Sequence, residues 1–167
     1  MMSPSSAPNA VATALFSPRE SIEFVEEGVR LAPKFCERGL LPCITTDADS
    51  GQVLMLGWMD TDALALTLRT AEAHYWSRSR QQVWRKGATS GLAQHVVEAR
   101  IDDDQDALWL RVRVQGLGAS CHVGYRSCFY RSVPIGQRAG GTLSFTEDHK
   151  VFDPVEVYGD APNPTQL

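Results

Sequence analysis

Short segments of strand-forming residues, interrupted by glycines, dominate this chain beyond residue 70. Strands are expected over residues 74–79, 83–86, 94–101, 107–114 and 128–133, with glycines at 87, 91, 116, 118 and 124 between them. Between residues 108 and 114, apolar residues alternate with Trp109, Arg111 and Arg113, which is the period of a strand with one buried face. The pattern therefore predicts a β-rich fold.

Earlier segments add a hairpin and two helices. Residues 41–46 and 52–59 read as strands around the turn-like residues 47–51. Ser17, Pro18 and Glu20 resemble a helix start, and apolar residues follow at helical spacing. Asp60 is expected to cap a second helix, in which Leu64 and Leu68 share a face. We expect an α+β, β-rich domain, compact, with two sheets or a pseudobarrel and two short helices.

Length and composition limit the classes of protein. The 167 residues suffice for one domain over 17–133, preceded by a disordered tail (1–16) and followed by a C-terminal extension (134–167). The net charge of −4 argues against a protein that coats nucleic acid or an anionic membrane. No apolar run is long enough to span a bilayer, and no basic residue precedes residues 10–16 as in an export signal. We expect a cytoplasmic protein whose four cysteines are reduced.

Aspartates mark the junction between two of the expected strands. On an extended backbone, Asp102, Asp104 and Asp106 would point to one side and Asp103 to the other. A hard cation such as Mg²⁺, which prefers oxygen ligands, would relieve their mutual repulsion. A calcium loop is excluded, because it needs a glutamate where the chain has Arg113. A solvated acidic turn without any metal is the alternative.

Two cysteines form a second candidate metal site. Six residues separate Cys121 from Cys128, and His122 follows the first. Cysteine sulfur and histidine nitrogen are typical zinc ligands. The spacing is not that of a zinc ribbon or knuckle, so a further ligand would have to come from elsewhere in the protein. Two buried thiols that only fill the core are the alternative, because cysteine is among the most buried residue types.

Residues 75–91 combine basic, aromatic and hydroxyl side chains. Guanidinium and ammonium groups beside serine, threonine and glycine suit phosphate oxygens. Aromatic rings in the same segment could stack on a base, as they also do in proteins that bind single-stranded RNA. The negative net charge favours a small phosphorylated ligand over a polymer. A solvated strand face without a ligand remains the alternative.

Four stretches occur together in this chain: GLLPCITTDADSGQVLMLGWM, EAHYWSRSRQQVWRKGATSG, IDDDQDALWLRV and GASCHVGYRSCFYR. As a set they resemble the phosphoribosyl-AMP cyclohydrolase family of histidine biosynthesis, from about Gly39 to Arg131. The resemblance implies hydrolytic opening of the adenine ring of 1-(5-phosphoribosyl)-AMP between N1 and C6 by a metal-activated water. It also implies a homodimer in which two subunits share the zinc site.

Site residues follow from the resemblance by motif position. Magnesium would be held by Asp102, Asp104 and Asp106, and zinc by Cys121 and Cys128. His122 is assigned to proton transfer. The residues expected to contact substrate are Trp76, Arg78, Arg80, Trp84, Arg85, Lys86, Thr89, Ser90 and Arg126.

One position departs from the family pattern. The family has a third zinc cysteine within the acidic motif, where this chain has Asp103. A carboxylate carries the same charge as a thiolate and can bind zinc, but it is a harder ligand that shifts preference towards Mn²⁺ or Fe²⁺. Two alternatives to the implied activity therefore stay open: a paralogous amidine hydrolase that acts on another nucleotide, and a non-catalytic protein that binds metal or nucleotide.

Overall fold

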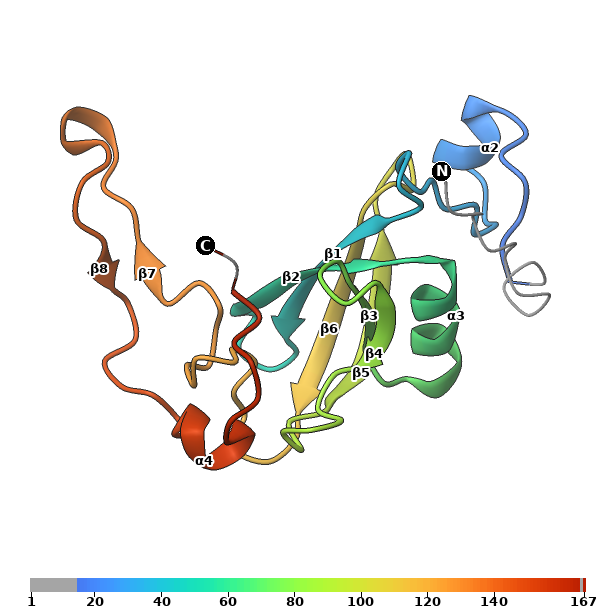
Figure 1. Cartoon of the computed structure of the whole chain (residues 1–167). Helices are drawn as coiled ribbons and strands as arrows, with labels where there is room; N and C mark the ends of the chain where they lie inside the picture. Colours follow the sequence, from blue (N-terminus) through green and yellow to red (C-terminus); the bar gives the residue numbers. More distant parts are fainter. Residues whose placement is uncertain (1–14, 166) are drawn as a thin grey trace, which may run out of the picture.

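A four-stranded sheet with strand order β2-β1-β6-β5 forms the centre of the computed structural model (Figure 1), which describes residues 15–165 and 167. The hairpin of β1 (Leu41–Asp47) and β2 (Val53–Met59) closes where the Asp47 carboxylate accepts from the backbone N–H of Asp49 and Ser50. The strands β5 (Gln94–Ile101) and β6 (Leu108–Val114) are also antiparallel, whereas β6 lies parallel to β1. These four strands confirm the predicted ones to within one residue at each end.

A helix and a second hairpin pack beside this sheet. β3 (His74–Ser77) and β4 (Gln82–Arg85) pair with each other, and α3 (Thr61–Thr70) packs against β3 (Figure 1). The predicted cap is confirmed, because the Asp60 carboxylate accepts from the N–H of Ala63 at 2.8 Å. Leu64 is fully buried, but Leu68 is 36% exposed, so only part of the expected apolar face enters the core.

The first helix begins later than predicted. α2 (Ile22–Glu26) is capped by Ser21, whose hydroxyl accepts from Phe24 N. Ser17 is not a cap, because residues 17–20 lie outside the helix; its N–H instead donates to the carbonyl of Leu31. Only Val25 of the expected apolar stripe is buried, while Ile22 and Val29 are exposed. The segment turns back on itself instead of presenting one long helical face.

The chain beyond residue 114 differs most from expectation. The strand predicted over 128–133 shrinks to β7 (Arg131–Ser132), which pairs with β8 (Ser144–Phe145) around the 3₁₀ helix η1 (Gly136–Arg138). The strand does not begin at residue 128, because Cys128 ends a compact loop there and its N–H donates to Leu54 O. Residues 129–145 form an arm that extends away from the central sheet (Figure 1).

A further short helix, α4 (Pro154–Tyr158), makes the prediction of two helices wrong. Its signals were present in the sequence: Asp153 caps it, and Pro154 occupies its first turn. Phe152, just before this helix, is buried against Leu92 and Ala119 in a second, small core. The described residues thus form an α+β, strand-rich fold with three short α-helices and open sheets, not a pseudobarrel. Among them, no helix has the length and apolar character to cross a membrane.

The predicted tail, residues 1–16, lies outside the described residues except for its last two members. Phe16 is partly buried, and its ring lies 6.4 Å from that of Phe35, centroid to centroid. Residues 15 and 16 are therefore the part of the predicted tail that the structure describes.

Candidate active site

The turn between β5 and β6 gathers three of the four aspartates predicted there. One carboxylate oxygen from each of Asp102, Asp104 and Asp106 lies within 4.8 Å of the others. The expected extended backbone is wrong: Gln105 has φ +57°, and the Asp102 carboxylate accepts from Asp106 N and Ala107 N at 2.9 and 3.0 Å. Partial desolvation, then the charges of Asp104 and Asp102, raise the pKa of Asp106. A tight turn, not strand alternation, brings the carboxylates together, and Asp103 lies exposed outside this cluster.

The N-terminal segment holds the acidic turn in place through Gln105. The buried amide of this residue accepts from Ala32 N at 2.7 Å and donates to the carbonyls of Val25 and Arg30 at 3.0 and 3.2 Å. The guanidinium of Arg19 donates to the carbonyls of Asp104 and Ala32. Sequence reasoning missed both residues, because each acts on backbone groups that are distant along the chain.

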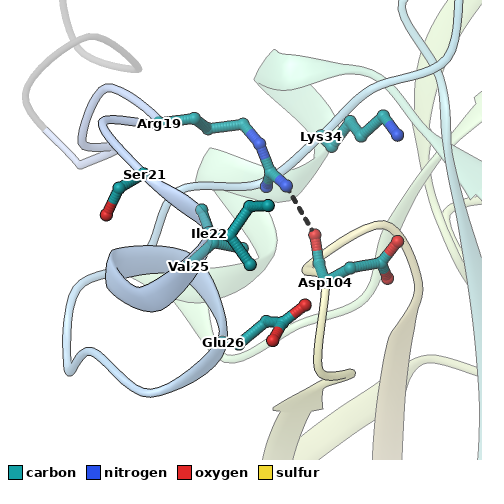
Figure 2. A pocket seen from close by; sticks show the side chains of 7 residues that line it. All are labelled: Arg19, Ser21, Ile22, Val25, Glu26, Lys34 and Asp104. Atoms are coloured by element: carbon teal, nitrogen blue, oxygen red, sulfur yellow. Dashed lines mark hydrogen bonds between the residues drawn. The ribbon is translucent and has the colours of Figure 1, made fainter.

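A cavity of about 390 Å³ opens beside the acidic turn. Figure 2 shows that Arg19 reaches across it to Asp104, with Lys34 on the same rim and Glu26 opposite. Ile22 and Val25 supply its apolar wall. The acidic turn is therefore reachable from a hollow that carries two cationic side chains.

The segment with the two cysteines is a compact loop. Cys121 N donates to Tyr125 O at 3.2 Å, and Gly124 N donates to Cys121 O at 3.1 Å. Cys121 is buried, whereas Cys128 keeps part of its surface exposed. The interaction between the two thiols lowers the pKa of Cys121, and the same interaction, with partial desolvation of the sulfur, raises the pKa of Cys128. The pair therefore gives up its first proton readily and its second reluctantly.

A half-buried histidine and a buried lysine lie beside the thiols. The Nε2 atom of His122 is the one buried side-chain nitrogen or oxygen in the described part of the chain that has no hydrogen-bond partner. Burial, with a smaller contribution from the charge of Lys86, lowers the pKa of His122. The Lys86 ammonium donates to Ser120 O at 2.6 Å, and burial lowers its pKa while the two thiols act in the opposite direction. A buried polar atom usually has a hydrogen-bond partner, so the unpartnered Nε2 is a candidate atom for contact with a ligand.

The basic and aromatic segment lies on the β3–β4 hairpin and the turn after it. Arg78 and Arg80 are exposed, and their guanidinium carbons lie 5.4 and 5.9 Å from the ring centroids of Trp58 and Trp84. Arg85 pairs with Glu72 at 3.1 Å. The remaining members of the predicted set are distributed as follows: Trp76 and Ser90 are half-buried, Thr89 and Arg126 are exposed, and Lys86 is buried beside the cysteines.

One chain does not bring the two candidate metal sites together. The acidic turn precedes β6 and the cysteine loop follows it, so the seven residues of this strand separate them (Figure 1). At about 3.3 Å per residue, the strand alone spans roughly 20 Å. The thiols and carboxylates of a single chain therefore belong to opposite ends of the sheet.

Comparison with known proteins identifies the family. Residues 55–130 match the family model described as phosphoribosyl-AMP cyclohydrolase. A phosphoribosyl-AMP cyclohydrolase of Rhodopseudomonas palustris (strain BisB18) is 49% identical over 142 residues, which are 85% of this chain and 96% of that protein. Proteins of the same name from Nitrobacter winogradskyi and Rhizobium etli (strain CIAT 652) are 50% and 47% identical, over 80% and 85% of this chain and 90% and 94% of their own. The chain belongs to the phosphoribosyl-AMP cyclohydrolase family.

Proposed function

We propose that this chain hydrolyses the N1–C6 bond of the adenine ring in 1-(5-phosphoribosyl)-AMP, a step of L-histidine biosynthesis. The product is the formimino-aminoimidazole carboxamide ribonucleotide. The observation that carries the proposal is the buried, unpartnered Nε2 of His122, which follows directly on one of two thiols that shift each other's pKa. The names of the relatives agree with this reaction.

The donor set around Cys121 and Cys128 fits zinc. The lowered pKa of Cys121 favours a thiolate ligand there, and the buried cation of Lys86 offsets part of the negative charge of the two sulfurs. When bound, zinc lowers the pKa of a coordinated water to about 7, from 15.7 in bulk. The carboxylates of Asp102, Asp104 and Asp106 fit magnesium, which takes oxygen ligands and would hold phosphate charge.

The protein's own groups bind the substrate and move the proton. Partial burial lowers the pKa of His122, which favours the neutral imidazole, and its Nε2 accepts a proton from the attacking water and returns it to the leaving N1. The exposed guanidinium groups of Arg78 and Arg80 bind phosphate oxygens, and the adjacent ring of Trp84 supports the base. The remaining members of this substrate set are Trp76, Arg85, Lys86, Thr89, Ser90 and Arg126. Among them, the buried Lys86 acts at the thiols rather than on phosphate.

A homodimer completes the site in this proposal. Because roughly 20 Å of β6 separates the thiols from the carboxylates, a second copy must supply the other half. The outer face of the central sheet offers apolar surface for such a contact: Leu56, Ile44 and Trp109 are cross-strand neighbours and are 48%, 42% and 36% exposed. The arm also exposes Phe129, Val133 and Ile135. Apolar surface of this kind is typical of contacts between copies of a chain.

Asp103 takes the place of the third sulfur ligand in this arrangement. It lies exposed on the acidic turn, outside the magnesium cluster, where a second copy could present its thiols to it. A carboxylate oxygen preserves the charge of the ligand set but weakens the preference for zinc over Mn²⁺ and Fe²⁺. The enzyme acts in the cytoplasm, where the cysteines, all of which are free, remain reduced.

The test is turnover of phosphoribosyl-AMP by protein stripped with a chelator and then restored with zinc, manganese or iron, with magnesium present or absent. Activity that returns with one of these metals supports the proposal. Absence of turnover under every metal condition, with intact metal binding, would instead identify a binding protein. Turnover of a different nucleotide alone would identify a paralogous amidine hydrolase.

A further inference from the structure

The C-terminal extension runs beside the cysteine loop. Thr146 N donates to Tyr130 O at 2.9 Å, and Val151 N donates to Gly124 O at 2.7 Å. Gly124 has φ +104°, and a Cβ atom there would collide with the carbonyl of Phe152. Phe152 itself is buried in the second core. The extension is therefore anchored at both ends of the segment that faces the loop, although it lies outside the residues that match the family model.

Glu147 forms the centre of this contact. Its two carboxylate oxygens accept from the backbone N–H groups of Arg126 and Ser127 at 2.8 and 2.9 Å, and one of them also accepts from the Gln52 side chain at 3.4 Å. These two N–H groups immediately precede Cys128. On its other side, Cys128 is tied to β2, because its own N–H donates to Leu54 O at 2.7 Å.

We propose that Glu147 is a positioning residue for Cys128. The carboxylate holds the backbone of residues 126–127 in the conformation that turns Cys128 towards Cys121, and β2 holds the same loop from the opposite side. The inference rests on the proposed function in one respect, namely that the two sulfurs bind zinc. It adds a residue 19 positions beyond Cys128, in a part of the chain to which the sequence assigned no role.

The two hydrogen bonds of Glu147 determine which variants test its role. In Glu147→Gln the side chain keeps its length, but its NH₂ group is a donor and cannot accept from a backbone N–H, so one of the two bonds is lost. In Glu147→Asp the charge is kept, but the shorter side chain cannot reach both N–H groups. Asp148→Asn is the matched control, because it removes one negative charge from the exposed neighbouring residue. Thermal unfolding shows which variants are folded.

Two measurements read the effect without relying on activity. Hydrogen exchange of the Arg126 and Ser127 amides in the metal-free protein reports the contact itself. Competition with a chromophoric chelator reports zinc affinity, which falls by about 10- to 100-fold when a residue that orients a ligand is removed. We expect both Glu147 variants to lose amide protection and zinc affinity, and Asp148→Asn to retain both. In turnover assays we expect kcat to fall more than KM rises.

Several outcomes would overturn the proposal. Wild-type zinc affinity in folded Glu147→Gln and Glu147→Asp, despite faster exchange of the two amides, would show that the contact does not position Cys128. Loss of affinity in Glu147→Gln and Asp148→Asn but not in Glu147→Asp would show that only charge matters. A wild-type protein with protected amides that binds no zinc would refute zinc binding in the proposed function, and with it the positioning role, while leaving the Glu147 contact demonstrated.

Discussion

Gln105 connects the acidic turn to the N-terminal segment, and its replacement by alanine should be costly. The change leaves two buried backbone groups without their partner, the N–H of Ala32 and the carbonyl of Val25. A buried polar group that loses its hydrogen bond costs about 1–3 kcal/mol. The third group, the carbonyl of Arg30, is only partly buried, so its lost hydrogen bond adds little to the loss of stability. We therefore expect Gln105→Ala to lower the free energy of unfolding by about 2–6 kcal/mol, the sum for the two buried groups.

A glycine variant separates the side-chain effect from the backbone effect. Gln105 has φ +57°, a left-handed conformation that costs a residue with a side chain about 1–2 kcal/mol and costs glycine almost nothing. Glycine also makes the unfolded chain more flexible, which offsets part of this gain. Gln105→Gly should therefore be more stable than Gln105→Ala by about 1 kcal/mol, although both lack the same three hydrogen bonds.

Urea unfolding of the three proteins measures these differences as shifts of the midpoint at constant slope. Limited proteolysis should cut residues 17–34 faster in both variants, and magnesium binding should weaken because Gln105 lies between Asp104 and Asp106. An alanine variant within about 0.5 kcal/mol of wild type, which is the scatter of neutral surface substitutions, would refute the reasoning about the buried amide. A glycine variant less stable than the alanine variant would refute the reasoning about the backbone.

The remaining predictions concern the metal ligands and a helix cap. Cys121→Ala and Cys128→Ala should each abolish turnover of phosphoribosyl-AMP in a folded protein, while the control Cys36→Ala, an exposed cysteine, should not; retained activity in either site variant would show that the thiols only pack. Asp103→Cys should raise zinc affinity in chelator competition, and an unchanged affinity would place this side chain outside the ligand set. Asp60→Ala should destabilise the fold by about 1 kcal/mol in urea, whereas Asp60→Asn retains the cap. Burial raises the pKa of Asp60 above 3.8, so just above pH 3.8 the folded state binds more protons than the unfolded state, and the free energy of unfolding falls as the pH rises through that window. Asp60→Asn should remove this pH dependence. An unchanged pH dependence would show that it does not come from Asp60.

The sequence alone was sufficient to predict the elements that depend on interactions between residues close together in the chain. Strand-forming residues bounded by turn signals located β1, β2 and β5, and alternation of apolar and polar residues located β6, because both signals act over only a few residues. The cap at Asp60 was equally readable, since a cap acts on a backbone group three positions away. The motif residues of both candidate metal sites could be named for the same reason: their types and spacing lie within single short segments.

The tertiary structure determined the backbone conformation of those segments and where they lie relative to one another. The acidic motif was expected to be extended, but the buried bonds of Gln105 to residues far away in the sequence impose a left-handed turn there. The contact of Glu147 with the loop before Cys128 likewise joins segments about 20 residues apart. The placement of thiols and carboxylates at opposite ends of β6 follows from strand order and direction. None of these features is visible in a short window of sequence, because each depends on which distant backbone groups meet once the chain has folded.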